Sequence, residues 1–137
     1  MTTSQRQTLS FLTRRLKEIG IQPNTRHGQN FLIDLNLVEL LVESAELDKR
    51  DVVLEVGTGT GSLTSMMAQR AGHVVTVEPD AALHQLAREE CVDHQNITFL
   101  HMDALRKKNN LRAEVIETVE QRMSGIENGH FKLAANL

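Results

Sequence analysis

Glycines at alternate positions give this sequence its strongest chemical signal. Segment 55–61 reads Glu-Val-Gly-Thr-Gly-Thr-Gly and joins a short β-branched run to an amphipathic one. Glycine lets the backbone turn sharply and lets a ligand touch the main chain. The free N–H groups at the start of the following helix can face that ligand. The pattern predicts a ligand-binding loop between a strand and a helix, with a ligand-free turn as the alternative.

The spacing of the glycines indicates which cofactor the loop would bind. A dinucleotide loop has the pattern G-x-G-x-x-G, whose third glycine would fall at position 62, but that residue is Ser62. The acid Glu55 stands two residues before Gly57. A carboxylate so close would repel a pyrophosphate and would suit a ligand that carries an ammonium and a sulfonium. The loop therefore favours S-adenosylmethionine over a nicotinamide dinucleotide.

Acidic residues also follow the next two expected strands. Glu78 ends the second strand, where nucleotide-binding α/β folds place an acid that accepts hydrogen bonds from ribose hydroxyls. Asp103 follows the third strand and could accept a hydrogen bond from the exocyclic amine of adenine. The alternatives are a solvated strand-end acid for Glu78 and, for Asp103, the cap of a helix that begins at Ala104.

Two polar segments could complete such a site. Segment 28–32 reads Gly-Gln-Asn-Phe-Leu, and its amides could close over the amino-acid end of a ligand or could form a helix-entry turn. Asn136 ends the last expected strand. In a parallel sheet it would project into the crevice beside the glycine loop.

The elements that position these residues alternate between strands and helices. Hydrophobic periodicity and stop signals predict helices over 4–19, 35–45, 63–71, 80–91 and 110–123, and strands over 52–56, 73–77, 97–101 and 131–135. This order indicates an α/β doubly wound fold with a parallel sheet. Because the sequence ends on the fourth strand, we expect a truncated sheet whose open edge supports self-association.

Composition limits the other possibilities. The chain has 137 residues, of which 40% are hydrophobic and 24% charged, and its net charge is −3. These values fit one globular domain and exclude a disordered tail. The single cysteine, Cys91, allows no internal disulfide, which suits a reducing cytoplasm. No apolar run approaches the roughly 20 residues that cross a membrane. The six histidines show no metal-ligand spacing, so we expect no metal site.

Charge is unevenly distributed along the chain. Basic residues outnumber acidic ones in segments 1–33 and 104–137, whereas acidic residues dominate between them. A phosphate backbone would be attracted to the two basic segments. Solvated helix faces are the alternative interpretation.

Taken together, these segments resemble the ribosomal RNA adenine N6-dimethyltransferases, the KsgA and erm-type superfamily of class I methyltransferases. Segment 28–32 resembles the family's G-Q-N-F-L, and segment 55–61 its E-[IV]-G-x-G-x-G loop. Segment 77–80 resembles its [VI]-E-x-D strand end, and residues 103–104 match its D-A pair. Residues 136–137 are similar to the first half of the catalytic N-L-P-Y.

The resemblance implies a role for each matching residue. Asn136 would accept a hydrogen bond from N6 of the target adenine, while the Gly57–Gly61 backbone and nearby amides would hold the methionine moiety. Glu78 would bind the ribose, and Asp103 with Ala104 would bind adenine. The complete set of implied cofactor-binding residues is Gln29, Asn30, Leu32, Glu55, Gly57, Thr58, Gly59, Gly61, Glu78, Pro79, Asp103, Ala104 and Asn136.

The resemblance also implies an organisation and an activity. Residues 1–33 would form an N-terminal helix and a cofactor-closing segment, and residues 34–137 the first part of a Rossmann-like cofactor domain. On this resemblance, we expect the family's C-terminal RNA-contacting domain to lie outside this sequence. The parent protein would dimethylate two adjacent adenines of small-subunit rRNA during ribosome biogenesis, and this fragment alone would be inactive.

One segment departs from the family pattern. The stretch between Asp103 and Asn136 is longer than expected, and segment 106–130 is predicted to be a helical insertion. It carries Arg106-Lys107-Lys108, which we expect to face RNA. The remaining alternatives are an erm-type large-subunit methylase, a non-catalytic relative of the mitochondrial transcription-factor type, and a nicotinamide-dependent oxidoreductase.

Overall fold

A computed structural model describes residues 35–107 and 110–135. Its elements are α2 (Leu35–Ser44), β1 (Asp51–Val56), α3 (Ser62–Arg70), β2 (His73–Val77), α4 (Ala81–Glu90), β3 (Ile97–Leu100), β4 (Leu105–Lys107), β5 (Asn110–Leu111), α5 (Ala113–Ser124) and β6 (His130–Ala135). The helix predicted over 4–19, and with it segment 1–33, lies outside the described residues. Within those residues, no helix is both long enough and apolar enough to cross a membrane.

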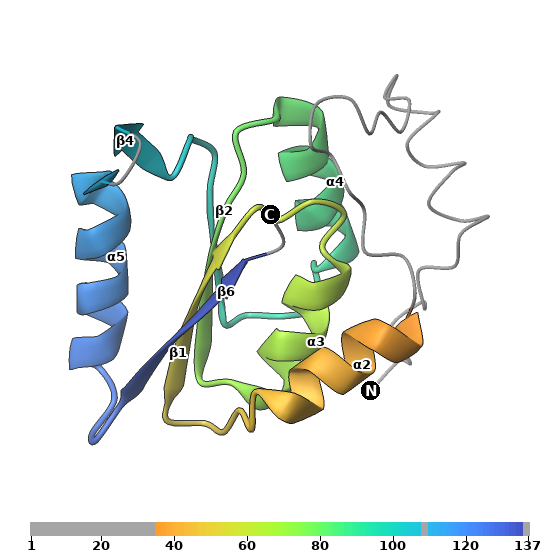
Figure 1. Ribbon diagram of the computed structural model, residues 1–137, viewed down its shortest axis with the longest axis vertical. Coiled ribbons are helices and arrows are strands. Elements are labelled where there is room, and N and C mark those ends of the chain that lie inside the picture. Colours follow the sequence, from red (N-terminus) through yellow and green to blue (C-terminus); the bar gives the residue numbers. More distant parts are fainter. Residues whose placement is uncertain (1–34, 108–109, 136–137) are drawn as a thin grey trace.

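Four parallel strands form the central sheet, in the order β3-β2-β1-β6. Helix α5 covers one face, and α2, α3 and α4 cover the other (Figure 1). Alternate residues of β1 supply both cores: Val52 and Leu54 pack with Val115 of α5, whereas Val53 packs with Met67 of α3. The four predicted strands are confirmed. The two central ones, β1 and β2, are buried on both faces, which is why they are near-continuous apolar runs. The α/β doubly wound prediction is likewise confirmed.

The segment between β3 and β6 differs from the prediction. A helix was expected from residue 110, within a helical insertion over 106–130. Instead, β4 and β5 form an antiparallel hairpin, and α5 begins at Ala113. Val115 and Val119 of α5 are buried against the sheet. Two parallel strands need a crossover connection, which is usually a helix, so α5 is an integral layer of the fold and only the hairpin projects from it.

Strand β6 keeps an exposed apolar face. Phe131 and Leu133 pair with Val52 and Leu54 of β1, and the side chains of these two β6 residues are 48% and 63% exposed. Within the described part of the chain, β6 pairs only with β1. Exposed strand edges and apolar faces favour association between chains.

Self-association through β6 stays a prediction, and sedimentation tests it. We expect the weight-average mass to rise above that of a monomer as the protein concentration increases. Leu133→Lys should suppress the rise, because it places a charge on the exposed apolar face. A monomer at every concentration would contradict the expectation.

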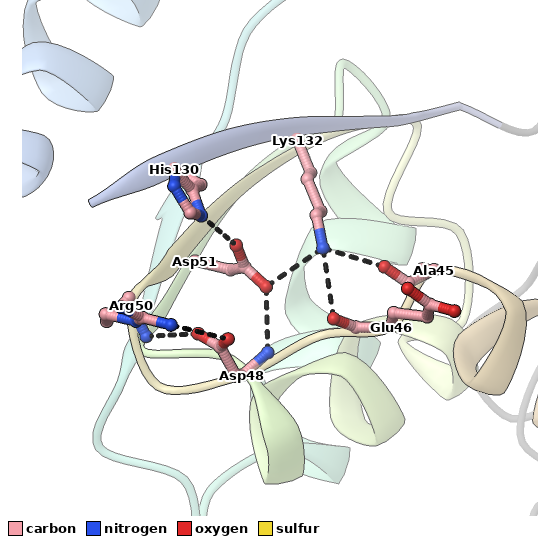
Figure 2. Close-up of polar contacts among 7 residues, drawn as sticks. All are labelled: Ala45, Glu46, Asp48, Arg50, Asp51, His130 and Lys132. Carbon is pink, nitrogen blue, oxygen red and sulfur yellow. Dashed lines mark hydrogen bonds and ion pairs between the residues drawn. The ribbon is translucent and has the colours of Figure 1, made fainter. Parts of the chain in front are cut away.

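An ion pair between the buried Asp51 and the partly exposed Lys132 joins three elements at the amino ends of the strands (Figure 2). The Asp51 side chain, at the start of β1, is 1% exposed, and its Oδ2 accepts hydrogen bonds from Lys132 Nζ at 3.1 Å and from the Asp48 N–H at 2.8 Å. Lys132 Nζ also donates to the carbonyl oxygens of Ala45 and Glu46. Lys132 thus ties β6 to β1 and to the segment that follows α2, at the sheet edge opposite the glycine loop.

Candidate functional site

The glycine loop crosses the carboxyl ends of β1 and β2. Gly57, Gly59 and Gly61 have φ of 88°, 58° and 86°, in the left-handed region that favours glycine. The N–H groups of Gly57 and Thr58 donate to the carbonyl oxygen of Val77, at 2.9 and 3.3 Å. These bonds fix the start of the loop on the end of β2.

The three glycines face different surroundings. A Cβ atom added at Gly57 or Gly59 would meet no atom within 4 Å among the described residues. A Cβ atom at Gly61 would lie 3.2 Å from the Cα of Ala87 and 3.3 Å from Cys91 Sγ. Gly61 is therefore needed for the close approach of α3 to α4. Gly57 and Gly59 are needed for the backbone turn, and they leave open space in which a ligand can reach the main chain.

Glu78 lies against the loop directly after β2. Its side chain is buried, and Oε1 accepts a hydrogen bond from the Gly59 N–H at 2.9 Å. Oε2 accepts from the Asp80 N–H at 3.1 Å. Each carboxylate oxygen can accept a second hydrogen bond, so Glu78 can still bind hydroxyl groups while it holds the loop.

Glu55 lies beneath the loop, where it is 2% exposed. Its Oε1 accepts hydrogen bonds from the hydroxyls of Thr64 and Thr76. Because the Thr76 hydroxyl gives its one proton to Glu55, the Thr58 hydroxyl must donate in the 2.6 Å bond between Thr58 and Thr76. The network therefore runs from the loop down to Glu55. Direct contact between Glu55 and a cofactor stays a prediction.

Burial sets the protonation of Glu55. The pKa of this carboxyl is raised to about 7, mainly because burial removes its solvation. The hydrogen bonds from Thr64 and Thr76 lower the pKa by less than burial raises it. The negative charge of the nearby Glu78 raises it as well. Thr64 and Thr76 were not among the residues predicted from the sequence. The signal that could have identified Thr76 is a hydroxyl between the valines of β2.

The residues after β3 form the third part of the site. Asp103 Oδ1 accepts a hydrogen bond from the Leu105 N–H at 3.1 Å, and the side chain of Asp103 is exposed. Ala104 is buried. Since Leu105 begins β4, the alternative in which Asp103 caps a helix from Ala104 is wrong.

Pro79 lies exposed between Glu78 and the helix cap. Asp80 caps α4, because its side chain accepts a hydrogen bond from the Leu83 N–H at 3.0 Å. The predicted helix start at residue 80 therefore shifts by one residue, and Pro79 precedes the cap.

The structure gathers one part of the predicted site at the carboxyl edge of the sheet. That part contains Glu55, Gly57, Thr58, Gly59, Gly61, Glu78, Pro79, Asp103 and Ala104. The other predicted residues, Gln29, Asn30, Leu32 and Asn136, lie outside the described residues. Within the described ranges, no three His, Cys, Asp or Glu side chains cluster as a metal site would require.

Comparison with known families identifies the chain's relatives. The family model described as "Ribosomal RNA adenine dimethylase" matches residues 20–137. The chain belongs to this family. The assignment sets aside the nicotinamide-dependent oxidoreductase alternative.

Curated relatives carry the name "Ribosomal RNA small subunit methyltransferase A". One, from Clostridium botulinum (strain Langeland), is 39% identical over 114 residues, which cover 83% of this chain and 37% of the relative. Another, from Pediococcus pentosaceus, is 38% identical over 122 residues, which cover 89% of this chain and 38% of the relative. The chain thus spans well under half of the length of these proteins.

Solved structures support the fold. The crystal structure of the 23S rRNA methyltransferase ErmE has a TM-score of 0.53 and 38% identity, covering 57% of this chain and 32% of that one. The tRNA (m1A58) methyltransferase TrmI from Aquifex aeolicus has a TM-score of 0.52 and 24% identity, covering 68% of this chain and 38% of that one. The chain has the Rossmann-like fold of class I methyltransferases.

Proposed function

We propose that this chain carries the cofactor site of an S-adenosylmethionine-dependent rRNA methyltransferase. The activity is N6,N6-dimethylation of two adjacent adenines in small-subunit rRNA during ribosome biogenesis. The family match and the names of the curated relatives support the substrate class. The observation that carries the cofactor assignment is the buried Glu78 carboxylate, hydrogen-bonded to a glycine loop beside which the described residues leave open space.

The residues at the carboxyl edge fit this cofactor. When bound, S-adenosylmethionine supplies a methyl group on a sulfonium, which is cationic and carries no phosphate. The loop between Glu55 and Gly61 contains no basic residue, so nothing there opposes a cation. Glu78 would accept hydrogen bonds from the ribose hydroxyls. Asp103 and Ala104 would bind the adenine, and Pro79, which directly follows Glu78, would complete this part of the site.

Residues outside the described ranges complete the proposed site. Gln29, Asn30 and Leu32 would close over the methionine moiety. Asn136 would accept a hydrogen bond from the target N6–H, whose nitrogen lone pair is otherwise conjugated into the adenine ring. S-adenosylmethionine would supply the methyl group to that nitrogen, and the N6 proton would pass to water. These residues contribute mainly by positioning a base that has been taken out of its stack.

Calorimetric titration of S-adenosylhomocysteine tests the cofactor site. We expect the wild type to bind, and Glu78→Ala to weaken binding at least about tenfold, because hydrogen bonds to a charged group each contribute roughly 1.5–3 kcal/mol. Glu120→Ala, which removes an exposed carboxylate from α5, is the matched control. A wild type that does not bind, or equal affinities for the Glu78 and Glu120 variants, would contradict the assignment.

A large-subunit substrate is the second candidate, favoured by the 38% identity to ErmE. Methyl transfer by the full-length parent protein to immature small and large ribosomal subunits separates the two candidates. Modification of the small subunit alone supports the first proposal, and modification of the large subunit alone supports the second.

A further inference from the structure

The β4–β5 hairpin projects from the sheet edge that carries the glycine loop. In Figure 1 it lies above α5, at the end of the sheet where β1 turns into the loop. Leu105 pairs with Leu111, and Lys107 pairs with Asn110. All five described residues of the two strands are exposed.

The hairpin is a cationic surface. Arg106 and Lys107 are exposed, and within the described residues neither forms an ion pair. Segment 104–112 contains no acidic residue. Cations without an internal partner can bind an external anion without first breaking a contact in the protein. The chain as a whole has a net charge of −3, so this local positive charge is not a consequence of composition.

Two hydrogen bonds join the hairpin to the candidate cofactor site. Asp103 Oδ1 accepts from the Leu105 N–H at 3.1 Å, and the Ala104 carbonyl oxygen accepts from the Arg112 N–H at 2.9 Å. They fix both ends of the hairpin on the residues proposed to bind adenine. Lys107 is four residues beyond Asp103, which limits their backbone separation to about 14 Å. The backbone that carries the two cations therefore lies within about 14 Å of Asp103.

We propose that Arg106 and Lys107 bind the phosphate backbone of the RNA substrate and orient it at the cofactor edge. The proposal rests on the proposed function, which supplies RNA as the partner. Arginine and lysine side chains are the usual phosphate contacts of nucleic-acid-binding proteins. The described hairpin residues include no aromatic side chain for stacking on a base. Because phosphate contacts carry no base-sequence information, the contact is independent of base sequence and sensitive to salt.

The test compares two double variants that change charge equally. Arg106→Gln/Lys107→Gln removes the hairpin cations. Arg70→Gln/Arg88→Gln removes two exposed cations from the last turns of α3 and α4. Binding of a fluorescein-labelled RNA stem-loop is followed by fluorescence anisotropy over a sodium chloride series. Thermal unfolding of both variants verifies that these surface substitutions leave the fold intact.

The hairpin variant should bind the stem-loop severalfold more weakly at low salt. Its plot of log affinity against log salt should be less steep by about 1–2, since each lost phosphate contact removes roughly 0.7–0.9 from the slope. The control pair should change neither quantity. Equal effects of the two pairs, or no effect of the hairpin pair, would overturn the proposal.

Titration with S-adenosylhomocysteine separates this proposal from the proposed function. A wild type that binds the cofactor product but not the stem-loop overturns the hairpin proposal and leaves the cofactor site standing. A wild type that binds the stem-loop through the hairpin but does not bind S-adenosylhomocysteine supports the hairpin and overturns the proposed function.

Discussion

The wild type is expected to lose about 2–3 kcal/mol of folding stability between about pH 5 and pH 8. Glu55→Gln is expected to abolish this loss. Burial raises the pKa of Glu55 from 4.5 to about 7. Between these values the folded state holds a proton that the unfolded state has released, so stability falls as pH rises. At about pH 8, one unit above the folded-state pKa, both states are largely ionised and the loss is nearly complete. One pKa unit corresponds to about 1.4 kcal/mol, which gives the expected size.

Urea denaturation of three proteins measures this effect. The wild type, Glu55→Gln and the control Glu117→Gln, an exposed residue of α5, are compared at pH 5 and pH 8. The difference between wild type and variant is the relevant quantity, because it cancels titration of other groups such as His73, whose pKa burial lowers to about 4. If the free energies of unfolding of Glu55→Gln and wild type change equally with pH, the prediction is wrong.

The same variant distinguishes two roles for Glu55. Its carboxylate accepts hydrogen bonds from Thr64 and Thr76, and Thr76 in turn contacts Thr58 of the loop. A residue that only supports the loop should be replaceable by glutamine with little loss of affinity for S-adenosylhomocysteine at pH 8. Direct contact with the cofactor's ammonium would appear as weaker binding by the variant at that pH, where wild-type Glu55 is ionised.

Local patterns were sufficient to predict the sheet and the glycine loop. The β-branched runs at β1 and β2 are buried on both faces, so each one indicates a strand without reference to its neighbours. Gly57, Gly59 and Gly61 indicate a turn with positive φ, and all three have it. The acid that ends β2 is at the sheet edge with the loop, because parallel strands bring their carboxyl ends together.

Two features could not be predicted from the sequence, because they depend on contacts between segments that are separate along the chain. Leu111 shares helical spacing with Val115 and Val119, so the predicted helix included Leu111. In the structure, Leu111 instead pairs with Leu105 across the hairpin. Strands of three and two residues are too short to show an alternating pattern. The hydroxyl network under the loop joins Thr58, Thr76 and Glu55 from three segments, and its identity depends on the register between β1 and β2.

The second large effect concerns the other end of the sheet. Lys132→Met is expected to lower the free energy of unfolding by about 2 kcal/mol, because it leaves the buried Asp51 carboxylate without its cation. The loss is smaller than the roughly 3–5 kcal/mol of a fully buried pair, since the Lys132 side chain is 35% exposed. Asp51 is 1% exposed, and its Oδ1 has no hydrogen-bond partner among the described residues. His130 Nδ1, 3.9 Å from Oδ1, is beyond hydrogen-bond distance. The Asp48 N–H would then be the remaining hydrogen-bond donor to Asp51 among the described residues.

Urea denaturation of a double-mutant cycle isolates the pair. Asp51→Asn/Lys132→Met removes both charges and should recover part of the stability lost in Lys132→Met, since the cost comes from the unpaired carboxylate rather than from the absent lysine. Lys49→Met, which removes an exposed lysine bonded to a single carbonyl oxygen, should cost under about 1 kcal/mol. If the Lys132 variant is no less stable than the Lys49 control, the prediction is wrong and water solvates the Asp51 carboxylate in place of the lysine.

Because this ion pair lies at the end of the sheet opposite the glycine loop, the folded Lys132 variant should keep wild-type affinity for S-adenosylhomocysteine, whereas Glu78→Ala should lose affinity.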